Sequence, residues 1–310
     1  GASKRGWTTW LSAVAETMQA EATGGTSRVS AIIPMVIDVL NMPAQIEHHY
    51  KAYQGYPLND SLNGIVEGYS RALQDYVEMD VFDRLDTPAG ASLLKIVDPY
   101  TYRNILTMPK LIANSTGDQF FLPDSSKFYF DDMQGPNYLH YAANTDHSLT
   151  DSLMVDADTL ESILAFYRAH VKNMNPATTE PVVIPGYSWE ILDNRVEVVE
   201  GQNITYARTK ITADSMPVDG LIKVWRAYAP NQRDFRLESS QPPLWMDEDV
   251  EYDEEAGGWI IEAEIPAVGW QGFFGQMRFE GTAPGADFLF TTPVRVVPDN
   301  KYPAPNPERN

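Results

Sequence analysis

Hydrophobic positions near the start of the chain follow two different patterns. Trp10, Val14 and Met18 recur every four residues, which predicts a helix from Trp7 to about Ala22. The next apolar run, Arg28–Asp38, is nearly continuous, as in strands that are buried on both faces of a parallel sheet. Together the two segments predict an α/β arrangement, with a helix packed against a parallel sheet.

Two later apolar runs have the same character, and each ends in a polar loop. The run at 110–114 leads into TGD, which ends at Asp118, and the run YLHYAA leads into NTDH, which ends at His147. The aromatic stretch 41–97 has no repeated strand signal and is longer than an ordinary connection, which predicts a mostly helical lid. Apolar positions from Leu149 to His170 predict a last helix.

The pattern changes beyond the proline-rich linker KNMNPATTEPVVIPGY, which marks a boundary near residue 178. Short runs of alternating apolar and polar residues follow, without helices between them, and predict an antiparallel β-sandwich of immunoglobulin or fibronectin type. We therefore expect an α/β unit at 1–177, a β-sandwich at 178–298 and a flexible tail at 299–310. The runs lie at 195–199, 204–211, 221–227, 259–265, 276–280 and 288–297.

The composition narrows the classes of function. With 310 residues, of which 43% are hydrophobic, the chain is long and apolar enough for two ordinary cores. A net charge of −20 disfavours binding to nucleic acid or to an anionic membrane, and no apolar run is long enough to span a bilayer. The absence of cysteine excludes disulfides, thiolate catalysis and cysteine-ligated zinc. We interpret the acidic run DEDVEYDEE as a solvated surface segment.

The segment GASKRG contains the small residues of a nucleophile elbow, the sharp strand-to-helix turn that exposes the serine of many hydrolases. The serine is Ser3, with Gly1 two positions before it and Gly6 three positions after it. The usual G-x-S-x-G pattern requires a small residue at position 5, where this chain has Arg5. The motif is therefore a weak signal by itself, and the hypothesis depends on partners elsewhere in the chain.

Candidate partners follow in the order serine, acid, histidine that such hydrolases use. Asp118 and His147 each lie in a loop after a predicted strand, at the sheet edge where open α/β folds bind ligands. Ser3 would attack an acyl carbon, His147 would carry the proton and Asp118 would orient the imidazole. The backbone N–H of Lys4 would supply one oxyanion donor. Asp38, which ends the earlier buried run, is the alternative acid.

Residues of the lid and of the segment after it are candidates for a substrate pocket. Ordinary packing is the alternative for His48 and His49, and an ion pair with Asp98 is the alternative for Arg103. No further ligands accompany the histidines at helical spacing, so we expect neither a metal site nor a cofactor. The pocket candidates are His48, His49, Tyr100, Tyr102 and Arg103.

These segments resemble the PhoPQ-activated pathogenicity-related proteins, a family that includes the autocrine proliferation repressor group. The resemblance rests on GASKRGWTTW, AIIPMVIDVLN, IVDPYTYRNILTMPKLIANSTGDQFFLPDSS and NTDHSLT. It implies an α/β-hydrolase fold with a helical lid, a β-rich domain after it and a triad of Ser3, Asp118 and His147. Because TGDQFF matches the family motif, the resemblance favours Asp118 over Asp38. It also implies a periplasmic or secreted protein whose signal peptide lies upstream of Gly1.

The leading hypothesis is an exported serine hydrolase that acts on peptides through an acyl-enzyme, with an esterase as a neighbouring possibility. A secreted binding or signalling protein on the same scaffold is the alternative, because a fold does not establish an activity. The chain starts at an elbow without an initiator Met, so we interpret it as lacking the earlier part of the hydrolase domain. We expect this piece to be weakly active or inactive, because the earlier strands and a second oxyanion donor would be missing. The sequence leaves the oligomeric state open.

Overall fold

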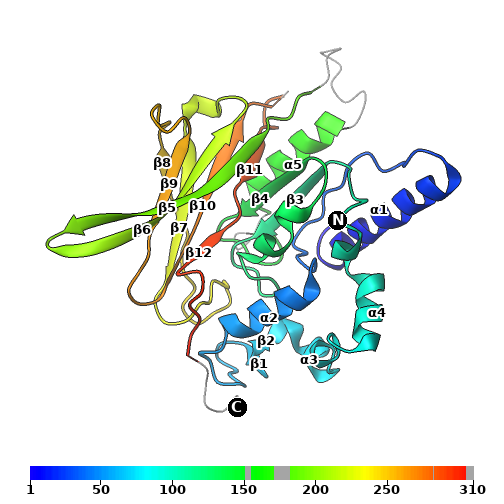
Figure 1. Ribbon diagram of the computed structural model, residues 1–310, viewed down its shortest axis with the longest axis horizontal. Coiled ribbons are helices and arrows are strands. Elements are labelled where there is room, and N and C mark those ends of the chain that lie inside the picture. The colour runs from blue at the N-terminus through cyan, green and yellow to red at the C-terminus, as the bar shows by residue number, and fades with distance from the viewer. Residues whose placement is uncertain (151–154, 171–181, 282, 305–310) are drawn as a thin grey trace.

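The computed structural model describes residues 1–150, 155–170, 182–281 and 283–304. Figure 1 shows two parts, one with helices around the parallel strands β3 and β4 and one made of long antiparallel strands. The boundary expected near residue 178 lies outside the described residues. No helix among the described residues combines the length and the apolar character that a membrane span requires.

A small parallel sheet organises the first part. β3 (Lys110–Ser115) pairs with β4 (Asn137–Ala142) in parallel, so that Lys110 lies opposite Asn137 and Ser115 opposite Ala142. Every residue of β3 is buried, as expected for a strand covered on both faces. The two strands end side by side, which brings the loops after them together.

The strand predicted at 28–38 lies beside β3 but forms only an interrupted ladder. Its residues make isolated parallel bridges to β3 on one side and to Ala2 on the other. Pro34 has no amide hydrogen to donate, and Val36 has a φ of 44°, so regular pairing cannot continue through this segment. The predicted position of the segment in the sheet is confirmed, whereas its continuous strand character is wrong.

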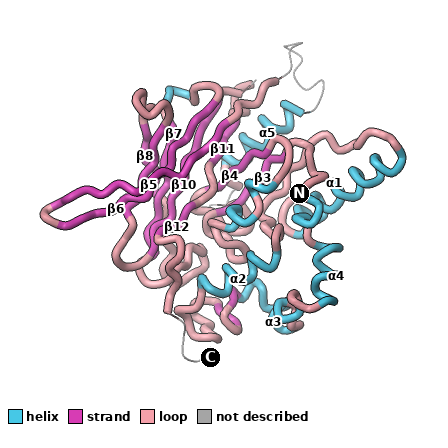
Figure 2. Tube along the Cα trace, viewed as in Figure 1, coloured by secondary structure: helices cyan, strands magenta, loops and turns pink. Residues whose placement is uncertain are grey.

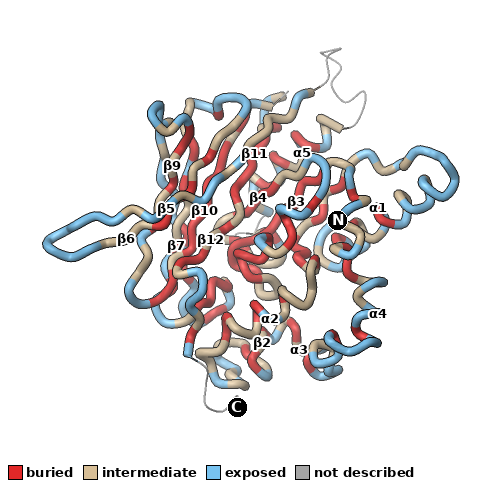
Figure 3. The backbone as a smooth tube through the Cα atoms, in the orientation of Figure 1, coloured by how far each residue is buried: buried red, intermediate tan, exposed pale blue. Residues whose placement is uncertain are grey.

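The helix α1 (Lys4–Thr23) contains the helix predicted from the spacing of apolar residues. Trp10 and Val14 are buried against the sheet, whereas Met18 is exposed. Met18 is exposed because the second half of α1 extends beyond the sheet into solvent (Figure 3). The helical period was therefore correct, but the buried face ends earlier than predicted.

The segment 41–97 is mostly helical, as predicted, and also contains a small hairpin that the pattern did not predict. Its helices are α2 (Met42–Ala52), α3 (Gln74–Glu78) and α4 (Pro88–Val97), and its hairpin pairs β1 (Ile65–Val66) with β2 (Tyr69–Ser70). Short 3₁₀ helices occur in this segment and elsewhere in the chain. They lie at Arg71–Leu73, Phe82–Arg84, Pro99–Tyr102, Ser125–Phe128, Phe130–Asp132 and Val218–Gly220.

The last helix of the first part is α5 (Ala157–His170), which buries Phe166 against the core. The prediction placed its start at Leu149, earlier than the structure does. Asp156 explains the later start, because its carboxylate accepts the backbone N–H of Thr159 at 2.7 Å, as a residue that caps a helix does. Residues 151–154 lie outside the described part.

The second part consists of two antiparallel sheets, as predicted for a sandwich (Figure 2). Their facing sides form one core, to which Ile211 and Ile261 contribute from one sheet and Val224 and Phe273 from the other. The three-stranded sheet contains β5 (Tyr187–Val199), β6 (Gln202–Ala213) and β9 (Trp259–Glu264). The five-stranded sheet contains β7 (Ile222–Ala229), β8 (Met246–Val250), β10 (Trp270–Phe279), β11 (Phe288–Thr291) and β12 (Arg295–Val297).

The strand β8 was not predicted, because it lies in the acidic run that we interpreted as a solvated segment. Four of its five residues are exposed, so the alternation of a half-buried strand is missing. Its acidic side chains pair with basic side chains of β7, and Arg226 Nη1 lies 2.7 Å from Glu248 Oε2. Cross-strand pairs of opposite charge stabilise a sheet edge even where little surface is buried.

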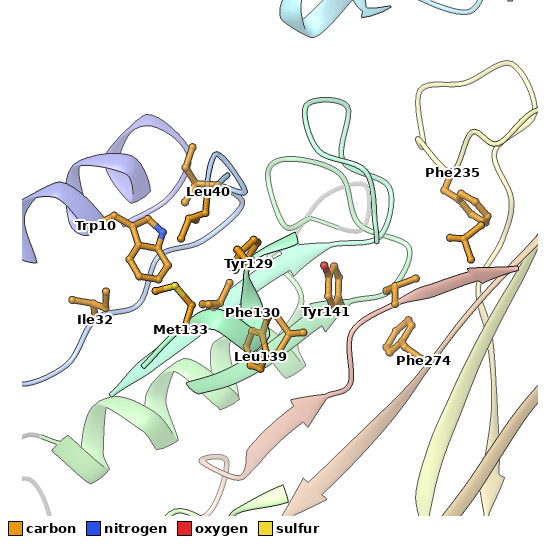
Figure 4. Close-up of a cluster of buried hydrophobic side chains, with 14 of the residues drawn as sticks. Trp10, Ile32, Leu40, Tyr129, Phe130, Met133, Leu139, Tyr141, Phe235 and Phe274 are labelled. Carbon is orange, nitrogen blue, oxygen red and sulfur yellow. The ribbon is translucent and has the colours of Figure 1, made fainter. Parts of the chain in front are cut away.

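The two parts share a hydrophobic cluster that runs from α1 through the parallel sheet to β10 (Figure 4). The outer edge of β4 is covered by side chains of the second part. The hydroxyl of Tyr187 accepts the N–H of Leu139 at 2.9 Å, and Thr291 Oγ1 accepts the N–H of Tyr141 at 3.1 Å. An edge strand exposes unpaired backbone groups, and these two hydroxyls satisfy part of them.

The tail expected from residue 299 differs from the prediction where the structure describes it. The hydroxyl of Tyr302 lies 3.0 Å from His48 Nδ1, and the indole of Trp270 donates to the carbonyl of Lys301 at 2.8 Å. Residues 299–304 therefore follow the surface of α2 and β10. Residues 305–310 lie outside the described part.

Candidate active site

Ser3 lies at a sharp turn between a short stretch of parallel pairing and α1. Its backbone N–H donates to the carbonyl of Met35 at 2.9 Å, and its own carbonyl accepts the N–H of Trp7 in the first turn of the helix. The backbone of Ser3 has φ 51° and ψ −127°, a combination that residues other than glycine rarely adopt. Such strain at a strand-to-helix turn is the geometry of a nucleophile elbow.

Gly6 allows α1 to approach the neighbouring strand segment. A Cβ atom at this position would lie 2.6 Å from Ile37 Cγ2 and 2.8 Å from the carbonyl oxygen of Gly1. The small residue that the elbow requires is therefore at position 6. Arg5, at the position where the usual pattern has a small residue, is exposed and does not obstruct the turn.

His147 connects Ser3 with Asp118. Its Nε2 lies 2.7 Å from Ser3 Oγ, and its Nδ1 lies 2.8 Å from Asp118 Oδ2. Asp118 is in the loop after β3 and His147 is in the loop after β4, so the parallel pairing of these strands brings their loops to one edge. The structure therefore brings together three residues that are far apart in the sequence.

The carboxylate of Asp118 is buried and held by the backbone. Its Oδ1 accepts the N–H groups of Phe120 at 2.7 Å and Phe121 at 3.3 Å, which leaves Oδ2 for His147. Burial raises the pKa of Asp118 above its usual value, although the hydrogen bond from His147 opposes this shift. The orientation of the carboxylate is thus fixed by two bonds that do not involve the imidazole.

Asp38, the alternative acid, has other partners. It is buried, its two carboxylate oxygens each accept from Asn114 Nδ2 at 3.0 Å, and Oδ1 also accepts the hydroxyl of Tyr129 at 2.5 Å. Burial raises its pKa to about 7. Asp38 lines the cavity next to Ser3, but the carboxylate in contact with His147 is that of Asp118.

The backbone N–H of Lys4 is the first of α1. The first N–H groups of a helix have no carbonyl partner within the helix, and the positive end of the helix dipole lies there. The N–H of Lys4 therefore suits the oxyanion donor that the sequence predicts.

A cavity of about 320 Å³ opens beside Ser3 and His147. Its wall is mostly apolar, with a few polar groups that include Asp38, Gln45 and His49. The lid contributes one face of α2, where residues three and four apart share a side, and the loop after β3 contributes two phenylalanines. The apolar lining residues include Trp7, Ile37, Val39, Met42, Ile46, Leu73, Tyr76, Phe82, Phe120, Phe121 and Leu122.

Sequence reasoning missed most of this lining. The signals that could have found it were the pair Phe120 and Phe121 directly after the proposed acid, and the spacing of Met42, Ile46 and His49 on a predicted helix. Of the five predicted pocket residues, His49 alone lines this cavity.

His48 lies outside the cavity because it belongs to a buried polar cluster on the other side of α2. Its Nε2 lies 2.8 Å from Asp124 Oδ1, and its Nδ1 lies 3.0 Å from the hydroxyl of Tyr302. Arg233 Nη2 donates to the second carboxylate oxygen of Asp124 at 2.6 Å. Burial lowers the pKa of His48 to about 4, so this histidine is a neutral structural residue.

The other three predicted pocket residues contact the surface of the first part. The hydroxyl of Tyr100 donates to Asp132 at 2.5 Å, and the hydroxyl of Tyr102 donates to the carbonyl of Lys95. Arg103 stacks over Tyr100, with its guanidinium carbon 4.3 Å from the ring centre. These residues lie in and directly after the 3₁₀ helix that follows α4, and they are not among the residues that line the cavity, so the prediction that they line the pocket is wrong.

The alternative for Arg103, an ion pair with Asp98, is also wrong. Asp98 caps the start of the next 3₁₀ helix and accepts the backbone N–H groups of Asn41, Met42 and Tyr100. Asp98 therefore connects the start of α2 to the end of α4 through backbone hydrogen bonds. Among the described residues, no three His, Cys, Asp or Glu side chains are grouped so that they could hold a metal ion.

Comparisons with known proteins agree with the family that the sequence resembles. A family model described as PhoPQ-activated pathogenicity-related protein matches residues 1–236. The chain is also similar to autocrine proliferation repressor protein A of Dictyostelium discoideum, with 29% identity over 318 aligned positions. This alignment covers 96% of the chain but 55% of that relative, so the chain spans about half the length of the relative. No solved structure matches the chain.

Proposed function

The chain belongs to the PhoPQ-activated pathogenicity-related protein family, and from this premise we propose that it is a serine hydrolase of the α/β-hydrolase type. The proposed triad is Ser3, His147 and Asp118. The observation that carries the proposal is the continuous path of contacts from Ser3 Oγ through both ring nitrogens of His147 to the carboxylate of Asp118. A nucleophile, a base and an orienting acid in hydrogen-bond contact form the arrangement of serine hydrolases on several unrelated folds.

The proposed reaction begins when Ser3 Oγ attacks the acyl carbon of the substrate. His147 Nε2 takes the hydroxyl proton and then donates it to the leaving group, which leaves an acyl-enzyme. Water, activated by the same nitrogen, hydrolyses the ester and restores Ser3. Asp118 keeps the proton of the neutral ring on Nδ1 and stabilises the imidazolium that forms in each half of the reaction.

The backbone N–H of Lys4 is the proposed oxyanion donor. It belongs to the residue after the nucleophile, as in other nucleophile elbows. A preorganised donor at this position stabilises the negative charge that develops on the substrate oxygen, and its removal in other enzymes costs about 10² to 10³ in rate. The positive end of α1 acts in the same direction.

We propose a peptide as the substrate, with an ester as the chemical alternative. The mostly apolar cavity beside Ser3 suits a large apolar side chain next to the scissile bond. Export from the cytoplasm belongs to the same proposal, since it rests on the family resemblance.

A second candidate function is a binding or signalling protein that keeps the hydrolase scaffold without turnover. It is favoured by the name of the Dictyostelium relative, which describes an autocrine repressor of proliferation. In that case the cavity beside Ser3 would hold a ligand without reaction.

Labelling with a fluorophosphonate separates the two candidates. Labelling is preferable to a turnover assay, because the probe requires an activated serine but no fit to an unidentified substrate. We expect the purified full-length protein to gain one adduct on Ser3, measured by intact-mass and peptide mass spectrometry. The Ser3→Ala variant should gain none, and Ser92→Ala, which changes an exposed serine of α4, should react like the wild type.

Absence of an adduct on full-length protein that circular dichroism finds folded would refute the hydrolase proposal and favour the binding protein. An adduct that persists in Ser3→Ala would assign the reactivity to another residue. Peptide hydrolysis by the labelled protein would be expected to stop, which links the adduct to the activity.

A further inference from the structure

A second cavity, of about 410 Å³, lies where the two parts of the chain meet. Three regions form its wall: the two 3₁₀ helices after β3, the strands β5 and β6, and the segment that contains β12 and the residues after it. It shares no lining residue with the cavity beside Ser3. The proposed triad and the proposed reaction therefore leave this second cavity without a role.

Part of its apolar wall comes from the inner face of the three-stranded sheet. Trp189 lies opposite the core residue Ile211, and cross-strand partners share a face of the sheet. Ile191, two positions further along β5, points to the same side. It is nevertheless 63% exposed, so the second sheet does not cover this part of the inner face. Apolar side chains that point inward are thus open to the cavity.

Arg295 of β12 is a partly buried cation without an ion-pair partner in the part of the chain that the structure describes. Its Nη1 donates to the carbonyl of Arg208 at 2.8 Å and to Thr209 Oγ1 at 2.9 Å, and its guanidinium carbon lies 5.2 Å from the ring centre of Phe273. Burial lowers the pKa of Arg295, and the charge of Asp299 opposes this shift. Nε is closed to solvent, whereas Nη2 is accessible and has no hydrogen bond. The guanidinium is therefore held in place with one nitrogen left for a ligand.

Other polar groups of the wall are also free. Trp189 Nε1 is accessible and has no hydrogen-bond partner among the described residues. Asp131, Asp299 and Asn300 are exposed, and within the described ranges their side chains make no hydrogen bond. The wall thus combines donors on Trp189 and Arg295 with acceptors on two carboxylates and an amide that does both.

The charges around the cavity balance. Asp124 in the wall is shared by two cations, Lys127 at 2.6 Å and the buried Arg233 at 2.6 Å. With Arg295 and the two exposed carboxylates, the described residues that line the cavity or form an ion pair with its wall contribute three positive and three negative charges. A site without net charge attracts neither a cation nor an anion strongly. A neutral group with hydroxyls suits it better, because each hydroxyl both donates and accepts.

We propose that this cavity binds a neutral carbohydrate. A sugar ring has hydroxyls around its edge and C–H groups on its faces, so one molecule uses the polar groups and the apolar wall together. Its hydroxyls donate to Asp131 and Asp299 and accept from Arg295 Nη2. Its C–H groups pack against Trp189 and Ile191. The volume of about 410 Å³ is in the range of small-molecule sites. The site is separate from the triad and stands whether or not the protein is a hydrolase.

NMR titration of the full-length protein with neutral trisaccharides tests this proposal. The probes are maltotriose, cellotriose, mannotriose and triacetylchitotriose, which differ in ring stereochemistry, substituents and linkage. We expect at least one of them to bind and to shift the indole N–H signal of Trp189 in ¹⁵N-labelled protein. A Trp189→Phe variant identifies that signal, because it removes the indole and keeps an aromatic ring.

Two exposed carboxylates allow a test by variants that does not endanger the fold. Asp131→Ala and Asp299→Ala should each weaken the binding of that trisaccharide about tenfold or more, as for one hydrogen bond to a charged group. Asp249→Ala, which removes an exposed carboxylate of β8 outside the cavity, should leave the affinity unchanged. Arg295→Gln should weaken binding as well, and its melting temperature is measured because Arg295 also holds β6.

Several results would overturn the inference. One is that none of the four trisaccharides binds. Another is that the bound sugar leaves the Trp189 signal in place and keeps its affinity in both aspartate variants. Tighter binding of glucuronate than of glucose would assign the site to an anion instead. A shift of the Trp189 signal with trialanine but with none of the sugars would assign it to a peptide.

Discussion

Replacement of Asp118 by asparagine tests the proposed triad most directly, because the structure fixes how the new amide must lie. In the native protein, Oδ1 accepts the N–H groups of Phe120 and Phe121, and Oδ2 faces His147 Nδ1. The amide oxygen of the introduced side chain must keep facing the two backbone donors, so its NH₂ group faces His147. An amide nitrogen only donates, and the imidazole must therefore accept at Nδ1.

The consequence appears at the other ring nitrogen. A neutral imidazole that accepts at Nδ1 has its proton on Nε2, which lies 2.7 Å from Ser3 Oγ and can then no longer take the serine proton. The same substitution in a serine protease triad lowers kcat by about 10⁴ through the wrong tautomer. We expect the rate of fluorophosphonate labelling to fall by roughly 10³ to 10⁴ in Asp118→Asn.

The assay is the rate of adduct formation at about pH 7.5, followed by intact-mass spectrometry, and the melting temperature of each variant is measured alongside it. Asp132→Asn is the matched control, because it changes an exposed carboxylate whose partner is the hydroxyl of Tyr100. The control should keep its labelling rate within about twofold, as surface substitutions away from a site usually do. A folded Asp118→Asn protein that reacts within about tenfold of the wild type would refute the role assigned to Asp118.

Three further outcomes follow from the same structure. Gly6→Ala should lower the free energy of unfolding, measured in a urea melt, by about 1 to 3 kcal/mol and should slow labelling of Ser3, because the added methyl group pushes α1 away from its strand. In the control Gly25→Ala, the added Cβ atom has its nearest contact at 3.3 Å, so neither the free energy of unfolding nor the labelling rate should change. The native protein keeps the proton of Asp38 up to about pH 7, whereas the unfolded chain loses it near pH 3.8, so the free energy of unfolding should fall by about 4 kcal/mol as the pH rises from about 4 to 7. Asp38→Asn should lack this part of the pH dependence, and an unchanged slope would assign it to other groups. Tyr302→Phe should cost about 1 kcal/mol, because it leaves the buried Nδ1 of His48 unpaired, and a value near zero would mean that residues after 299 do not dock in solution.

Elements with a clear period were predicted well, and those without one were missed. The helix α1 and the strands β6 and β9 each have several apolar residues at the spacing of their structure. The strand β8 and the hairpin of β1 and β2 do not, because their pairing is stabilised by charge or by the turn rather than by a buried face. The interruption at Pro34 and Val36 depends on backbone geometry that a run of apolar letters conceals.

The candidate site likewise contains residues that could be predicted from the sequence and residues that could not. Ser3, Asp118 and His147 could be chosen from the sequence because loops after parallel strands meet at one edge, whatever the details of packing. The pocket could not be predicted in this way. Tyr100, Tyr102 and Arg103 were chosen for their residue types, but they lie in and directly after the 3₁₀ helix that follows α4, and they contact Asp132, Lys95 and one another instead of the cavity. His48 and His49 are adjacent in the sequence, but successive residues of a helix point in different directions: His48 belongs to a structural cluster, whereas His49 lines the cavity.

The second part of the chain contributes to the site through contacts that no local pattern predicts. The N–H of Leu237 donates to the carbonyl of Gly117 at 3.1 Å, directly before the proposed acid, and a Cβ atom on Gly117 would lie 2.5 Å from Leu237 Cγ. Asn144, in the loop of the proposed base, donates to the carbonyl of Trp245 at 2.9 Å and accepts its N–H at 2.8 Å. Both loops of the candidate triad are thus held by the segment between β7 and β8. The family match extends to residue 236, past the boundary expected near residue 178, and so includes the first part of this segment but neither Leu237 nor Trp245.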